Sequence, residues 1–93
     1  MHRSKLEIYM DILRVLAEHG PSKITHIMYE VNLNCSVLKD CIGFLIKQGL
    51  VEEKAVGKKR FAYAVTQRGR ILIKAFEELK QALPVTEESL VSL

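Results

Sequence analysis

The sequence contains no tryptophan, only two prolines and only two cysteines among its 93 residues. Two cysteines are too few for a disulfide framework, and Cys35 and Cys41 point in different directions on one expected helix. A reducing cytoplasm is therefore the expected environment. No run of 18 apolar residues occurs, so we expect no membrane span. A chain of this length forms one small domain.

Patterns for catalysis and metal binding are also missing. The sequence has no glycine-rich phosphate loop, and no nucleophile, base and orienting partner assemble into a recognisable motif. His26, Cys35 and Cys41 match no zinc-ligand spacing, and Cys41 is better explained as a small core residue. We therefore expect no enzymatic activity, no metal and no cofactor.

Acidic residues are absent from the stretch 54–74, which holds seven basic ones. These are Lys54, Lys58, Lys59, Arg60, Arg68, Arg70 and Lys74. The other 72 residues hold seven bases and eleven acids, a local balance of −4, whereas the whole chain carries +3. This separation of charge favours contact of one side with a polyanion such as nucleic acid. The alternative is an ordinary solvated charged face.

Helical periodicity predicts three helices in the first half of the chain. The expected ranges are 4–19, 26–31 and 35–48. Ser4 and Glu7 form a capping-box pattern at the first start, while Thr25 and Asn34 are the expected caps of the other two. We expect the segment 32–34 to form a tight turn, in which the side chain of Leu33 is buried between two asparagines.

Two short strands and a final helix follow. The strands are expected at 50–56 and 60–65, joined by a turn at 57–59. Thr66 caps the final helix, which spans 66–83 and is stopped by Pro84. The tail 84–93 has few anchoring residues and is expected to be flexible.

The final helix carries an apolar seam with the spacing of a coiled coil. Its members are Leu72, Phe76, Leu79 and Leu83. One interpretation pairs this seam with the same helix of a second subunit. The other packs it against the domain's own core. We favour the homodimer.

The order of elements is that of an α+β, mostly helical, winged helix-turn-helix. In this fold class, residues 1–83 form one domain with a three-helix core, a two-stranded wing and a C-terminal dimerisation helix. The helix 35–48 would then present its outer face to the major groove of DNA, and the hairpin would reach the flanking backbone or minor groove.

A family resemblance agrees with this interpretation. The stretches that carry it are Ser4-Lys5-Leu6-Glu7-Ile8, Ile12-Leu13, Thr25-His26-Ile27-Met28-Tyr29, Asn32-Leu33, Phe44-Leu45, Gly49-Leu50-Val51 and Thr66-Gln67-Arg68-Gly69. Over residues 3–83 the chain resembles a family of small archaeal winged-helix proteins, which includes ten-kilodalton chromatin-associated proteins that dimerise through a C-terminal helix. The resemblance implies an archaeal or archaeal-virus source, a homodimer and DNA binding. The chain departs from the family at His26, where arginine is common, at Asn34-Cys35, where Ser-Tyr is common, and at Pro84, which shortens the last helix.

Two groups of residues are candidates for DNA contact. The outward face of the helix 35–48 comprises Ser36, Lys39, Asp40, Gly43 and Lys47. Lys39 is suited to a guanine edge or a phosphate, and Ser36 is small enough for close approach. Because this helix has no arginine, we expect modest sequence specificity. The alternative is an ordinary solvated helix face.

The wing supplies the second group. Lys58, Lys59 and Arg60 suit phosphate contact, with Arg60 a candidate for the minor groove. The alternative is that they only keep an exposed hairpin soluble. Arg68 and Arg70 open the last helix, where cations are unfavourable, so either an anionic partner or a pairing with Glu52 or Glu53 is needed to offset them.

The sequence therefore predicts a homodimeric winged-helix transcriptional regulator that binds double-stranded DNA in the cytoplasm, associated with the nucleoid. One alternative is an architectural nucleoid protein with little sequence preference. The other is a protein-interaction module, because winged helices can also bind protein partners through the same surfaces.

Overall fold

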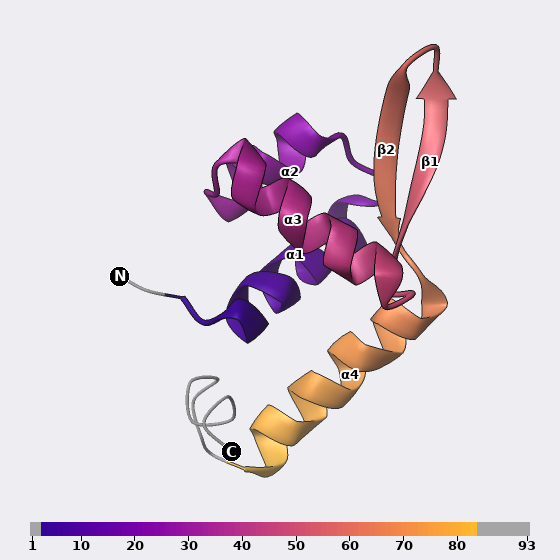
Figure 1. Cartoon of the computed structure of the whole chain (residues 1–93). Helices are drawn as coiled ribbons and strands as arrows, with labels where there is room; N and C mark the ends of the chain where they lie inside the picture. Colours follow the sequence, from indigo (N-terminus) through magenta and orange to yellow (C-terminus); the bar gives the residue numbers. More distant parts are fainter. Residues whose placement is uncertain (1–2, 84–93) are drawn as a thin grey trace.

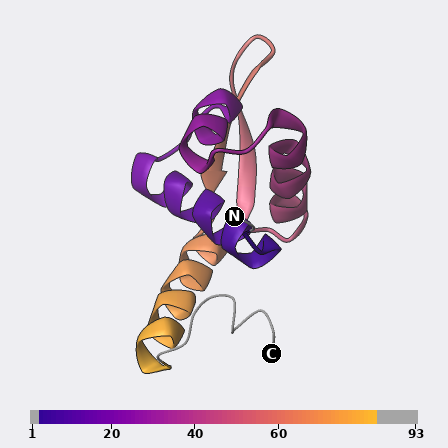
Figure 2. The ribbon, with the colours of Figure 1, turned by 90° about the vertical axis from the view of Figure 1, so that its left-hand side faces the viewer.

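The computed structural model describes residues 3–83. These residues form α1 (Lys5–His19), α2 (Ile24–Val31), α3 (Cys35–Lys47), β1 (Val51–Gly57), β2 (Arg60–Val65) and α4 (Gln67–Ala82). The first three helices pack together, and the β1–β2 hairpin and α4 extend from them at opposite ends (Figures 1 and 2). No helix among these residues has the length and apolar character that crossing a membrane requires. The winged helix-turn-helix order predicted from the sequence is confirmed.

Side-chain caps define where most of the helices begin. Ser4 accepts from the backbone N–H of Glu7, whose carboxylate accepts from the N–H of Ser4, so the predicted capping box is present. Asn34 accepts from the N–H of Val37 at 2.9 Å and caps α3 as predicted. Each of these contacts pairs a backbone N–H that would otherwise lack a helical partner.

The expected start of α2 is wrong. This helix begins at Ile24, with Lys23 as its N-cap and no side-chain cap, so Thr25 lies inside the first turn. The reason is a tertiary contact. Ser22 is held in a β-bridge by Tyr63, with N–H···O distances of 2.9 and 2.8 Å in the two directions. The chain therefore enters the helix directly after this bridge.

The turn between α2 and α3 depends on Asn32, which adopts a left-handed conformation with φ 55° and ψ 52°. Asparagine tolerates this region better than most residues. Leu33 follows and is half-buried rather than fully buried. The turn redirects the chain so that α3 packs on α2 with its outer face open to solvent.

The wing is an antiparallel pair with Val51 opposite Val65 and Ala55 opposite Phe61. Its register shifts between Ala55 and Gly57, so β1 extends to Gly57 and the turn is shorter than predicted. Lys59 takes the left-handed conformation in that turn, with φ 57°. The bulge and this turn together project the tip beyond the core.

A single core joins all the elements. Its buried members are Met10, Ile12, Leu13, Leu16, Ile27, Val31, Leu38, Ile42, Leu45, Val51, Val65 and Phe76. These follow the apolar stripes that the sequence predicts for the helices. Ile46, near the end of α3, is exposed.

The start of α4 is attached to the end of α3 through Thr66. The hydroxyl of Thr66 donates to the carbonyl of Gly49 at 2.7 Å and accepts from the N–H of Gly69 at 3.1 Å. A Cβ at Gly69 would lie 2.5 Å from the carbonyl oxygen of Leu50 and 2.6 Å from a methyl group of Val65. Only glycine allows the helix to approach the strand this closely.

The four residues of the predicted apolar seam on α4 lie in two different environments. Phe76 is buried in the protein's own core, while Leu72, Leu79 and Leu83 are exposed. The guanidinium of Arg14 bonds Glu77 at 2.7 Å and lies 5.8 Å from the centre of the Phe76 ring. These contacts fix which side of α4 faces α1. The tail 84–93 predicted to be flexible lies outside the described residues.

Candidate nucleic-acid interface

The outer face of α3 is open to solvent. All five of its candidate residues are exposed: Ser36, Lys39, Asp40, Gly43 and Lys47. The face is mixed in charge, and its two small residues, Ser36 and Gly43, allow close approach of another molecule.

A shallow hollow of about 190 Å³ separates α3 from the base of the wing. Lys39, Gly43 and Ile46 line its α3 side, and Glu53 and Tyr63 line its wing side. The hollow shows that α3 and the hairpin flank one surface. A duplex can therefore meet both together, which is the geometric requirement for a winged-helix grip.

Glu53 also lines this hollow, although the sequence did not indicate it as a site residue. Burial raises the pKa of Tyr63, and so do the hydrogen bond to Glu53 and the charge of that carboxylate. Tyr63 therefore stays protonated and donates to Glu53. The two residues are directly opposite in the antiparallel register, and that cross-strand pairing is the signal that could have revealed them.

The wing tip carries three consecutive exposed bases. Lys58, Lys59 and Arg60 are all exposed at the turn between β1 and β2. Farther down β1, the amine of Lys54 lies 3.3 Å from the carboxylate of Glu52. The positive charge of the tip thus extends away from the acids at the wing's base.

The acids proposed as partners for the arginines of α4 have other contacts. Glu52 pairs with Lys54, and Glu53 accepts from Tyr63. Arg68 instead passes close to Gly49, with its Cδ 3.9 Å from where a Cβ would stand. These contacts therefore do not include the ion pair between Arg68 and Glu52 or Glu53 that the sequence suggested as one alternative.

Lys39 and Gly43 are the only candidate residues that line the hollow, and two of the others, Asp40 and Arg68, line different hollows. Asp40 lines a separate surface pocket with Lys5 and Cys41, beside the start of α1. Burial raises the pKa of Cys41, the charge of Asp40 raises it further, and Lys5 opposes the shift. Arg68 lines a groove on the side of α4 instead. The hollow therefore brings together Lys39 and Gly43 but not Asp40 or Arg68.

That groove is apolar, has a volume of about 430 Å³ and lies between α1, α3 and α4. Its lining includes Leu6, Tyr9, Phe44, Ile71, Leu72 and Ala75. The rings of Tyr9 and Phe44 stack across it with centroids 4.9 Å apart. The groove is continuous with the exposed side of α4 through Ile71 and Leu72.

Comparison with known families agrees with this geometry. A family model described as winged helix-turn-helix matches residues 2–83. The chain therefore belongs to the winged helix-turn-helix family, a class of DNA-binding domains. Curated protein sequences gave no significant match.

Several solved structures share the fold. Sso10a-2, a DNA-binding protein from Sulfolobus solfataricus, is 30% identical with a TM-score of 0.74, over 97% of this chain and 87% of that one. A MarR-family transcriptional regulator from Silicibacter pomeroyi gives 0.73 at 17% identity, over 96% of this chain. BpsR from Bordetella bronchiseptica, whose DNA binding is regulated by 6-hydroxynicotinic acid, gives 0.69 at 15% identity, over 81%. This chain spans only 64% and 57% of those two regulators. The resemblance to small archaeal winged-helix proteins is thereby confirmed.

Proposed function

We propose that this protein is a homodimeric, non-enzymatic transcriptional regulator that binds double-stranded DNA of the nucleoid and needs no cofactor for that contact. The observation that carries the proposal is the common surface of α3 and the wing. Lys39 and Gly43 face the hollow from one side, and the hairpin that ends in the basic tip forms the other. Family membership supports DNA as the polyanion.

In the proposed complex, the exposed face of α3 enters the major groove and the wing follows the flanking backbone. Gly43 exposes backbone that can approach the groove closely. Lys58, Lys59 and Arg60 neutralise phosphates. The Glu53–Tyr63 pair remains at the base of the wing, where an acid is tolerated because the duplex contacts the tip.

Dimerisation through α4 is supported by its exposed apolar side chains. Ile71 is 61% exposed, Leu79 42% and Leu72 39%. Apolar residues at this spacing on a projecting helix favour contact with a second copy. A twofold dimer would hold two α3 helices and two wings against one duplex.

The composition of α3 favours a second candidate, an architectural protein with little sequence preference. This helix has no arginine, the commonest reader of guanine, and its lysines Lys39 and Lys47 suit phosphates equally. Selection of bound fragments from random and genomic DNA at two salt concentrations separates the two. Enrichment of a palindrome supports the regulator, whereas a steep salt dependence without enrichment supports the architectural role.

The wing's part in binding is tested by removing two charges there and two elsewhere. Lys58→Ala with Lys59→Ala should reduce the salt slope of DNA binding by about 3 to 4 in a dimer, at roughly 0.9 per lost phosphate contact. The matched control removes Lys5 and Lys23, two exposed bases outside the basic stretch 54–74. Equal DNA affinity in the wing variant and the unaltered protein would instead support the protein-interaction module.

A further inference from the structure

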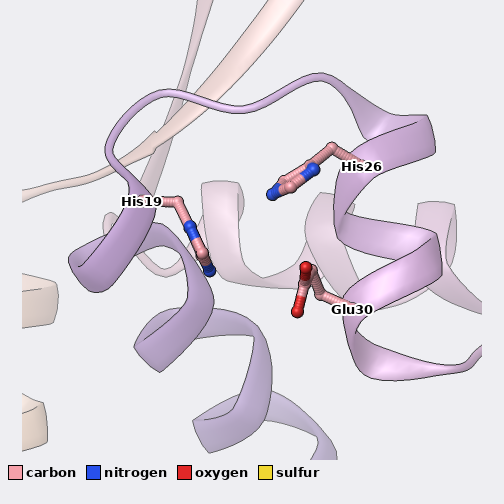
Figure 3. Close-up of side chains that lie close together, drawn as sticks. All are labelled: His19, His26 and Glu30. Carbon is pink, nitrogen blue, oxygen red and sulfur yellow. The ribbon is translucent and has the colours of Figure 1, made fainter.

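Two histidines and a glutamate meet where α1 ends and α2 begins. His19 is the last residue of α1, and His26 and Glu30 are one helical turn apart on α2. One ring nitrogen from each histidine and one carboxylate oxygen of Glu30 lie within 4.8 Å of one another. Figure 3 shows the three side chains turned toward a common point between the two helices.

The fold itself does not use these groups. All three side chains are exposed. The two imidazole rings meet edge to face, with centroids 5.1 Å apart and an angle of 81°. Within residues 3–83, none of the three side chains makes a hydrogen bond or an ion pair. Their lone pairs therefore remain available to a further group.

The donor set identifies the chemistry of that group. Two imidazoles and one carboxylate suit a borderline metal dication such as Zn²⁺, whereas Mg²⁺ and Ca²⁺ prefer oxygen alone. Around tetrahedral zinc, ligand atoms stand about 3.3 Å apart, given bonds of roughly 2.0–2.1 Å. Rotation of the exposed side chains would bring the three ligand atoms from within 4.8 Å of one another to that spacing, and a water molecule would supply the fourth ligand.

We propose that His19, His26 and Glu30 form a binding site for a transition-metal dication, zinc in particular, which joins the end of α1 to α2. The two helices supply ligands that are close only in the folded chain, so binding stabilises the native state. The last carbonyls of α1 favour a cation at His19. Because α2 is the first helix of the helix-turn-helix, the metal fixes the element on which α3 packs.

This inference goes beyond the proposed function and does not depend on it. Its test uses the full chain without an affinity tag, stripped with a chelator and titrated with zinc chloride by calorimetry. We expect one zinc per protomer and a higher melting temperature. His19→Ala and His26→Ala should each weaken binding by more than about tenfold, because even groups that only orient a metal ligand are worth roughly 10–100-fold.

Two controls are matched to these variants. His2→Ala removes one imidazole that is not among the three proposed ligands, and Cys35→Ser removes an exposed cysteine side chain on α3, a zinc-binding group outside the cluster. Both should bind zinc as the unaltered protein does. Cobalt(II) gives an independent readout, since its visible absorption reports nitrogen ligation and should be lost with either histidine of the cluster.

Three results would overturn the site. These are no binding in excess zinc, affinity unchanged in both His19→Ala and His26→Ala, or affinity lost in Cys35→Ser. Circular dichroism of each variant distinguishes loss of the site from loss of the fold. Since all three cluster side chains are exposed, we expect the variants to fold.

Discussion

The wing and α4 both extend from the same helical core, yet they expose opposite kinds of side chain. The wing ends in Lys58, Lys59 and Arg60, all exposed. The outer side of α4 instead exposes Ile71, Leu72 and other large apolar groups. A basic tip is suited to a polyanion, whereas an apolar helix face is suited to another protein surface.

The two extensions also differ in how they are attached. The tip of the wing is held by the hairpin's own register and a left-handed Lys59. By contrast, α4 is fixed at its start by Thr66 and Gly69 and along its length by Arg14–Glu77. The more precisely anchored extension is the one proposed to set the geometry between two subunits, while the basic tip is left to adjust to a backbone.

The largest effect should come from placing charge on the apolar side of α4. Leu72→Glu combined with Leu79→Glu should convert the proposed dimer to a monomer, because carboxylates would be buried without partners. Loss of the second binding unit should lower DNA affinity by about 10²-fold or more. Analytical ultracentrifugation and DNA titration measure the two effects. Gln81→Glu, on an exposed position of the same helix, is the control; a dimer that persists in the double variant would rule out this interface.

The anchor of α4 is tested at Gly69. Gly69→Ala should destabilise the fold by about 1–3 kcal/mol, because its methyl group overlaps the Leu50 carbonyl. Gly43→Ala makes the same chemical change on open α3 surface and should stabilise the fold by up to about 1 kcal/mol. Urea denaturation gives both values. Equal stability of the two variants would contradict the close approach of α4 to the strand.

The caps of α2 and α3 give a smaller and more local comparison. Asn34→Ala should cost about 1 kcal/mol, since it removes the acceptor for the N–H of Val37. Thr25→Ala should have little effect, because Thr25 lies within α2 and caps nothing. Thermal unfolding of the two variants side by side measures the difference. A larger loss of stability in Thr25→Ala than in Asn34→Ala would indicate that Thr25 caps α2, as expected from the sequence.

The smallest effect should come from a single substitution on α3. Lys39→Ala should reduce the salt slope of DNA binding by about 0.9 per protomer if Lys39 contacts one phosphate. If Lys39 contacts a guanine edge instead, the substitution should leave the salt slope unchanged and decrease the preference for the target sequence. Fluorescence anisotropy with specific and random duplexes over a salt series separates these outcomes, with Lys5→Ala as the control. If neither the salt slope nor the preference for the target sequence changes, Lys39 does not contact DNA.

Much of the fold could be predicted because its signals are local. The start of α1 follows from Ser4 and Glu7, and the starts of α3 and α4 follow from Asn34 and Thr66. The start of α2 was placed wrongly because Tyr63, forty-one residues beyond Ser22, sets it through a β-bridge. The exposed face of α3 followed from periodicity, but Glu53 in the hollow depends on strand register.

The sequence by itself determined the order of elements, the caps of α1, α3 and α4, and the separation of basic from acidic residues, since each depends on neighbours along the chain. Only the tertiary structure decided that Phe76 belongs to the core, that Gly69 must lack a side chain, and that His19 meets His26 and Glu30. Those features depend on distances between elements. Such distances are set by how side chains fill a shared core, which no short stretch of sequence specifies.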